Sequence, residues 1–323
     1  MNETLDRTGL IETPGNPLPE GIVCGKVTTP DRVRLRYAVS PARHLKTRGT
    51  VILLQGRNET IEKYFETIGD LTALGYMVAT FDWRGQGGSD RLLRRSRLGH
   101  VPRFEAYVDD LETIFREVVL PDCRGPFAVL AHSMGGAVAM LGAPRLLNRV
   151  ERIVAAAPLI SLPETGPDPR RLEIGTTFLR YTGLGRLPMP SPHRAKGLPT
   201  VDTSLLTSDA RRLQRNLALM EAAPQLFVGN PTAGWLNAAT TTMRLLDDSD
   251  VIAKLQVPTL FVTAGADRIV SSAAAERLAW RMRSGHSITL PGARHEILQE
   301  ADRYREPFLA AFDAFAGGAL PLE

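Results

Sequence analysis

Three residues that together can hydrolyse an ester occur in the chain in the order serine, aspartate, histidine. Ser133 lies in AHSMGG (131–136), Asp267 in AGADRIV (264–270) and His295 in GARHEIL (292–298). A serine hydroxyl becomes a strong nucleophile when a histidine accepts its proton, and a carboxylate orients that histidine. This chain order is typical of such residues when each follows a different strand of one sheet. We therefore predict Ser133 as nucleophile, Asp267 as acid and His295 as base.

Ser133 stands where a predicted strand runs directly into a predicted helix. The strand is FAVLAHS (127–133) and the helix is GGAVAMLGA (135–143). A sharp turn at this junction would lift the serine Oγ off the sheet edge, and the small residues Ala131 and Gly135 would let strand and helix approach closely. Read alone, AHSMGG also fits a serine that only caps a helix. Its position between strand and helix favours the nucleophile.

Hydrolysis of an ester also needs two N–H donors for the negative oxygen that develops on the substrate. We predict the backbone amide of Met134, directly after the nucleophile, as one donor. The loop after TVILLQG (50–56) should supply the other, and we assign it to the amide of Arg57 because Gly56 gives that loop conformational freedom. No metal or other cofactor is expected.

Other histidines are weaker candidates for the base. His132 precedes the nucleophile inside the turn, so its side chain should point away from the site. His286 opens a predicted strand, and we interpret it as structural too. His100 lies beside a predicted helix, where packing or tethering of a loop is the expected role.

The elements that must position these residues alternate between strand and helix. Residues 21–29 and 32–39 predict an antiparallel hairpin, and from residue 50 the alternation of buried strands with amphipathic helices predicts a parallel sheet wrapped by helices on both faces. The pattern stops near residue 159 and resumes near 246. We therefore divide the chain into a loosely ordered lead-in (1–20), an α/β core (21–159 and 246–323) and an inserted helical cap (160–245).

Composition supports a folded globular enzyme. The chain has 323 residues, of which 43% are apolar and 23% charged. Cys24 and Cys123 are too few for a disulfide framework and lack the spacing of a zinc site. The first twenty residues show neither a basic stretch nor an apolar one, and no apolar run approaches the length of a membrane span. A cytoplasmic location is expected.

The motifs together resemble the α/β-hydrolase superfamily, in particular its lysophospholipase and monoacylglycerol lipase branch with a helical cap. LLQGRNETIEKY, FDWRGQGGSDR, GHVPRFEAYVDDL and AHSMGG carry this resemblance, and AGADRIV and GARHEIL extend it over most of the chain. The resemblance implies the same nucleophile, acid, base and oxyanion amides as the residues do. Two positions depart from the family pattern, since Ala131 replaces a common glycine and Gln55 a common histidine.

The resemblance implies cleavage of carboxylic esters of lipid-like substrates through an acyl-enzyme, with the cap as the roof of an acyl pocket. Two alternatives stay open. One is a small-molecule receptor that kept the pocket without the chemistry. The other is an aminopeptidase of the same superfamily, for which Glu164, Glu173 or Glu221 would have to hold the substrate amine.

Charge suggests a possible partner surface. The chain has 34 Arg and only 5 Lys, and residues 160–245 hold ten basic and six acidic residues, which equals the whole net charge of +4. A second cluster of arginines lies between residues 84 and 103, where Asp90 is the only acidic residue. Its members are Arg84, Arg91, Arg94, Arg95, Arg97 and Arg103. These arginines could attract phosphate headgroups or the inner face of an anionic membrane, or form an ordinary solvated surface. No nucleic-acid partner is expected.

Overall fold

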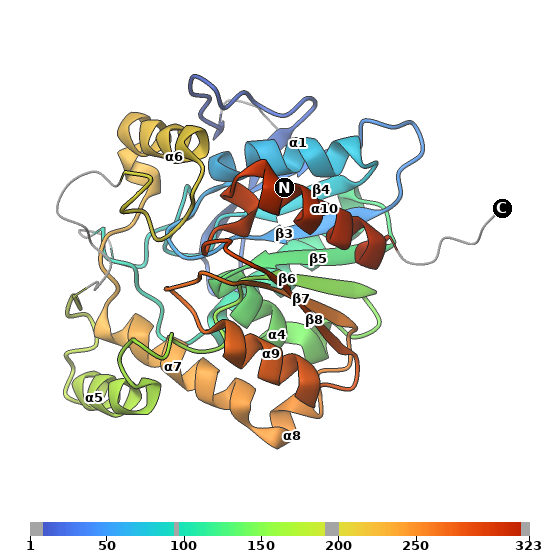
Figure 1. The fold of residues 1–323 in the computed structure, drawn as a ribbon. Helices are drawn as coiled ribbons and strands as arrows, with labels where there is room; N and C mark the ends of the chain where they lie inside the picture. The colour runs from blue at the N-terminus through green and yellow to red at the C-terminus, as the bar shows by residue number, and fades with distance from the viewer. Residues whose placement is uncertain (1–8, 94–96, 191–199, 318–323) are drawn as a thin grey trace.

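A central eight-stranded sheet runs through the molecule (Figure 1). The computed structural model describes residues 9–93, 97–190 and 200–317. The strands are β1 (Val23–Thr28), β2 (Arg34–Ser40), β3 (Thr50–Leu54), β4 (Met77–Phe81), β5 (Phe127–His132), β6 (Arg152–Ala156), β7 (Thr259–Ala264) and β8 (Gly285–Leu290). Their spatial order is β1-β2-β4-β3-β5-β6-β7-β8. The pairs β1·β2 and β2·β4 are antiparallel and the other pairs are parallel.

Helices cover both faces of this sheet, which explains why its central strands are apolar runs rather than alternating patterns. Strands β3 and β7 are buried throughout. Helices α1 and α10 lie on one face, and α4 and α9 on the other (Figure 1). The bounds are η2 (Ile61–Tyr64), α1 (Phe65–Ala73), α2 (Glu105–Ile114), η3 (Phe115–Val119), α3 (Leu120–Asp122), α4 (Met134–Leu146), α9 (Ser272–Arg281), η5 (Ile297–Gln299) and α10 (Asp302–Ala316). The predicted fold class is confirmed.

In the described residues between β6 and β7, the regular elements are helices joined by loops. They are α5 (Pro169–Tyr181), α6 (Ala210–Ala222), η4 (Pro224–Leu226), α7 (Ala233–Asp247) and α8 (Ser249–Ile252). The side chains of Asp168, Asp209 and Thr232 accept backbone N–H bonds at the starts of α5, α6 and α7, which explains where these helices begin. Helix α7 packs against both α5 and α4, so it joins the insertion to the core.

Two arginines anchor the α6 end of the insertion, the segment between β6 and β7, to the core. The buried guanidinium of Arg212 donates to the carboxylates of Glu66 and Asp302 at 2.6 Å each, and to the carbonyl of Glu300 at 2.8 Å. Arg294, next to the predicted base, donates through Nη1 to three carbonyls of the insertion. These belong to Val201, Ser204 and Thr207, at 2.6, 2.8 and 3.0 Å. The insertion and the loop of His295 are therefore directly connected.

Candidate active site

The backbone turns sharply at Ser133, between the end of β5 and the start of α4. Ser133 has φ 49° and ψ −114°, in a region that residues with a side chain rarely occupy. Neighbouring strands hold this conformation, since the Ser133 N–H donates to the carbonyl of Ala156 at 3.1 Å and its carbonyl accepts from the N–H of Leu159 at 2.9 Å. The turn therefore carries the strain expected of a nucleophile between a strand and a helix.

Gly135 allows α4 to approach the loop that follows β3. A Cβ atom at this position would lie 2.6 Å from the carbonyl oxygen of Leu54 and 2.7 Å from that of Gln55. Both obstacles are backbone atoms at the root of the predicted oxyanion loop. The absence of a side chain at residue 135 therefore brings the nucleophile and that loop together.

We expect Gly135→Ala to lower both the free energy of unfolding and the ester hydrolysis rate. Backbone at the collision point must shift, and overpacking of this kind costs about 1–3 kcal/mol. Chemical denaturation and steady-state kinetics measure the two effects. Gly175→Ala on α5 is the matched control, because a Cβ there meets no atom within 4 Å and alanine favours a helix. Equal stability and rate in the two variants would contradict the close-approach argument.

The structure brings the three predicted side chains together. His295 Nε2 lies 3.0 Å from Ser133 Oγ, and His295 Nδ1 lies 2.8 Å from Asp267 Oδ2. Ser133 is 9% exposed and His295 4%, so both side chains lie within the protein. Asp267 follows β7 and His295 follows β8, at the edge of the sheet where Ser133 follows β5. The geometry allows the imidazole to take a proton from the hydroxyl.

Asp267 is held as a carboxylate. Its Oδ1 accepts the backbone N–H groups of Ile269 at 2.7 Å and Val270 at 3.0 Å, which leaves Oδ2 for the imidazole. Burial acts to raise the pKa of Asp267, but the charge interaction and hydrogen bond with His295, together with the two N–H bonds, hold that pKa below its ordinary value. The carboxylate is thus charged wherever the protein works near neutral pH.

The two predicted oxyanion amides occupy adjacent elements. Among the described residues, the N–H groups of Arg57 and Met134 have no hydrogen-bond acceptor. The neighbouring Gly56 N–H is instead directed to the carboxylate of Glu59. Strands β3 and β5, which precede the two amides, are paired with Leu54 opposite Ala131. Two unoccupied donors therefore lie beside the serine turn.

The Arg57 side chain leads from this loop to the insertion. Its guanidinium lies over the ring of Trp235 on α7, with its carbon 5.2 Å from the ring centroid, and Nη2 donates to the carbonyl of Gly229. Nε is buried without a partner among the described residues. Burial lowers the pKa of Arg57 to about 10. This guanidinium is enclosed by protein, so we assign only the backbone of Arg57 to the oxyanion site.

The expectation that His132 points away from the site is wrong. Its ring centroid lies 4.9 Å from that of His295, and its Nε2 lies 3.7 Å from Glu59 Oε1. Side chains alternate between sheet faces only while the backbone is extended, and the turn at Ser133 ends that regularity. Burial lowers the pKa of His132 to about 4, so the ring is neutral. His100 tethers the insertion, with Nδ1 2.8 Å from Thr232 Oγ1.

The arginine cluster between residues 84 and 103 is mostly engaged within the protein. Arg84 is buried and paired with Asp110 and Asp31, so it is not available to a headgroup. Arg91 donates to the carbonyls of Gly85 and Gln225. Arg97 and Arg103 are exposed, while residues 94–96 lie outside the described part of the chain. The prediction of a headgroup site is therefore wrong for Arg84.

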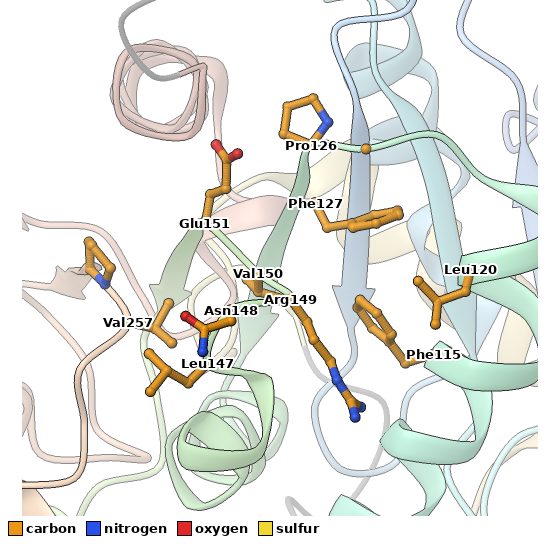
Figure 2. A pocket seen from close by; sticks show the side chains of 12 residues that line it. Phe115, Leu120, Pro126, Phe127, Leu147, Asn148, Arg149, Val150, Glu151 and Val257 are labelled. Carbon is orange, nitrogen blue, oxygen red and sulfur yellow. The ribbon is translucent and has the colours of Figure 1, made fainter.

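A surface cavity of about 540 Å³ lies at the opposite edge of the sheet from Ser133 (Figure 2). Its lining includes Phe127, Glu151 and Val257, which stand at or before the starts of β5, β6 and β7. The serine turn follows the end of β5, so this cavity does not belong to the site. No group of three His, Cys, Asp or Glu side chains suited to a metal ion occurs in the described ranges.

Sequence reasoning missed three charged residues behind the site. Glu59, Lys63 and Glu296 form a buried set of ion pairs, with Lys63 Nζ 2.7 Å from Glu59 Oε1 and 2.6 Å from Glu296 Oε1. Glu59 and Lys63 are four residues apart, a spacing at which helical side chains meet, so this pair was visible in the sequence. Glu296 was not, because 233 residues separate it from Lys63.

Comparison with known proteins gives relatives over most of the chain. Residues 45–302 match the family model described as serine aminopeptidase, S33. The chain is 32% identical over 295 residues to lysophospholipase L2 of Escherichia coli strain K12, covering 88% of this chain and 84% of that protein. It is 26% identical to the probable lysophospholipase L2 of Haemophilus influenzae, covering 88% of each.

Solved structures share the fold. A soluble variant of monoglyceride lipase from Saccharomyces cerevisiae superimposes with a TM-score of 0.73 at 20% identity, covering 94% of this chain and 97% of that one. The monoacylglycerol lipase of Paleococcus ferrophilus gives 0.67 at 19% identity, covering 87% and 98%. From the family match, the relative at 32% identity and the shared fold, we conclude that this chain is a serine hydrolase of the α/β-hydrolase family.

Proposed function

We propose that the protein hydrolyses carboxylic esters of lipid-like substrates, of the lysophospholipase or monoacylglycerol lipase type, with Ser133, His295 and Asp267 as its catalytic triad. The observation that carries this proposal is the continuous set of contacts from Ser133 Oγ through the imidazole to the carboxylate, at 3.0 and 2.8 Å. The names of the curated relatives support the lipid class.

The contacts define the steps. His295 Nε2 takes the proton from Ser133 Oγ as that oxygen bonds to the ester carbonyl carbon, and the carbonyl oxygen becomes negative between the amides of Arg57 and Met134. When the tetrahedral intermediate collapses, the ester C–O bond breaks and the imidazolium gives its proton to the departing alcohol. Water then attacks the acyl-enzyme, again losing a proton to Nε2, and the fatty acid is released as serine regains its proton.

We assign residues 160–245 as a cap that roofs the acyl site. Arg57 supports this assignment, because its guanidinium runs from the oxyanion loop to Trp235 and Gly229 of the insertion. The buried side chain of Trp235 also donates to Tyr107 Oη of the core at 3.3 Å. The insertion thus lies over the loop where the ester would be held.

The three glutamates that could have bound the amine of an aminopeptidase substrate are not suited to that role, which favours an ester substrate. Glu173 accepts from Arg244 Nε and Thr241 Oγ1, both at 3.1 Å, so its charge is engaged. Glu164 and Glu221 are exposed. A free substrate amine would need an enclosed, unpaired carboxylate close to the nucleophile, and none of these three glutamates provides one.

Helix α5 carries a surface suited to a lipid layer. Its exposed apolar side chains include Ile174, Phe178 and Tyr181, which are 71%, 67% and 88% exposed. Their spacing of four and three residues places them on one face. Exposed arginines stand on or just after the same helix, at positions 170, 171, 180 and 186. An apolar face bordered by arginines fits the boundary of an anionic membrane, and we propose peripheral contact there.

Substrate profiling tests the proposed activity. We expect hydrolysis of lysophospholipids and monoacylglycerols with little action on aminoacyl amides, and a preference for lysophospholipids that shrinks between about 50 and 500 mM salt, because salt screens attraction to the phosphate. Release of fatty acid gives the rates. Equal rates on both lipids, or a preference that salt leaves unchanged, would favour a neutral-lipid esterase. Faster cleavage of aminoacyl amides would overturn the ester assignment.

Vesicle sedimentation tests the membrane contact. We expect Phe178→Ser to weaken binding to phosphatidylglycerol vesicles about tenfold, which corresponds to the loss of roughly 1.5 kcal/mol of apolar burial. Trp280→Ser is the matched control, because Trp280 is a 78% exposed aromatic residue on α9. An equal loss in both variants, or equal binding of the wild type to neutral phosphatidylcholine, would contradict a role for α5 and its arginines.

A further inference from the structure

Three charged side chains form a buried chain behind the proposed active site. Lys63 Nζ donates to Glu59 Oε1 at 2.7 Å and to Glu296 Oε1 at 2.6 Å. The side chains of Lys63, Glu59 and Glu296 are 8%, 5% and 7% exposed. Burying charge is costly unless each ion is paired and hydrogen-bonded. The positions of these three ions are therefore tightly linked.

At one end of this set of ion pairs, Glu59 holds the loop after β3 that carries the proposed oxyanion amide. Glu59 Oε2 accepts the N–H of Gly56 and the hydroxyl of Tyr64, the latter at 2.6 Å. Holding the Gly56 N–H anchors the peptide unit that precedes the next amide, so only the φ and ψ of Gly56 separate that amide from the anchor. That amide belongs to Arg57, the proposed oxyanion donor. Glu59 thus occupies the Gly56 donor and leaves the Arg57 donor for substrate.

The Glu296 end holds the loop of the proposed base. Glu296 directly follows His295, and its N–H donates to the carbonyl of Leu206 at 2.8 Å. Its carboxylate is bound to Lys63 of η2, so both its backbone and its side chain are anchored. Lys63 therefore connects the element after β3 to the residue beside the imidazole.

The buried set of Lys63, Glu59 and Glu296 also has an unbalanced charge. Lys63 and Glu59 hold each other charged, since each counteracts the effect of burial on the other's pKa. With His132 neutral, one cation faces two carboxylates, which leaves one net negative charge. The groups close to the His295 imidazole are Asp267, Ser133 and His132, and Glu59 lies on the far side of His132. The three ions therefore lie directly behind the imidazole, with the neutral ring of His132 between them.

We propose that Lys63 is a positioning residue that holds the oxyanion loop and the histidine loop in register through Glu59 and Glu296. It does not touch the substrate. This inference rests on the proposed function, because it gives Lys63 a role in ester hydrolysis. It adds a second layer of residues that sets the geometry of the oxyanion loop and of the histidine loop.

Steady-state kinetics of the full chain on a p-nitrophenyl ester test this role. We expect Lys63→Met to lower kcat about 30- to 100-fold with KM changed less than threefold, because a misplacement of about 1 Å in reacting groups can cost 10²-fold in rate. Lys63→Arg should recover kcat to within about tenfold of wild type, since a guanidinium can bond to two carboxylates.

A matched control separates positioning from stability. Arg84→Met also removes a buried cation between two carboxylates, those of Asp110 and Asp31, which lie outside both loops. Thermal melts set an assay temperature at which every variant is folded. If Lys63→Met loses no more kcat than Arg84→Met, the proposal is overturned.

Glu296→Gln covers the case in which Lys63→Met does not fold, because glutamine keeps the shape and can still accept from Lys63. The substitution replaces the charge-assisted bond to Lys63 with a weaker neutral one, so we expect kcat to fall about three- to tenfold with KM changed less than threefold. An unchanged kcat would overturn the proposal. A wild-type rate no higher than that of Ser133→Ala would instead show that the proposed function itself is wrong.

Discussion

Ser133→Ala should reduce ester hydrolysis by about 10⁴- to 10⁶-fold while leaving the protein folded. Removing the nucleophile leaves only the residual effect of substrate binding and of the oxyanion donors. The turn itself should persist, because its backbone is held by hydrogen bonds from residue 133 to Ala156 and Leu159 that do not involve the side chain. Fatty acid release measures the rate, and far-ultraviolet circular dichroism with a thermal melt confirms folding.

A fluorophosphonate probe gives the same test without a substrate. The wild type should be labelled at Ser133, and Ser133→Ala should not be. Ser271→Ala is the matched control, because Ser271 is a buried serine that caps α9. Ser271→Ala should be less stable and still be labelled. An unlabelled, folded wild type would favour the receptor interpretation, and hydrolysis retained by Ser133→Ala would place the nucleophile elsewhere.

Asp267→Asn should reduce kcat by about 10³- to 10⁴-fold with a much smaller change in KM. The reason is that both carboxylate oxygens accept hydrogen bonds, Oδ1 from Ile269 and Val270 and Oδ2 from His295. An asparagine amide has only one oxygen. Whichever way it turns, its NH₂ group either faces two backbone donors or forces the imidazole into the wrong tautomer.

The contrast with Asp209→Asn makes this prediction specific. Asp209 caps α6 and also pairs with Arg212, so its substitution removes a charged cap outside the triad. We expect Asp209→Asn to lose some stability and to keep kcat within a few-fold of wild type. If Asp267→Asn had the kcat of wild type, another carboxylate would have to orient the imidazole.

The fold and the Ser–His–Asp contacts were readable from sequence because they depend on local patterns. Apolar runs such as TVILL identify strands buried on both faces. Ser133 and Asp267 each follow such a strand, and His295 follows the edge strand β8. Parallel strands place their carboxyl ends at one edge, so residues distant in sequence converge there. The structure shows their proximity at 3.0 and 2.8 Å, and their catalytic roles stay predictions.

Contacts that depend on side-chain direction or on long-range pairing could not be read in this way. The position of His132 follows from a turn with positive φ, which strand alternation does not describe. The pairing of Lys63 with Glu296 depends on how η2 packs against the loop after β8. The buried state of Arg84, in the loop after β4, depends on Asp110 of helix α2. Counting arginines shows where charge is present, but not which charges are already neutralised inside the fold.

The insertion is fastened to the core at its α6 end, and this determines which side of it can open. Arg212 and Arg294 bind that end through several hydrogen bonds, one set of which reaches the residue next to His295. An opening motion there would pull on the base itself. Helix α5 contacts chiefly α7. On the proposed function, a long acyl chain should therefore enter and leave beneath α5, so that the helix for which we propose contact with a lipid layer would also border the route from that layer to Ser133.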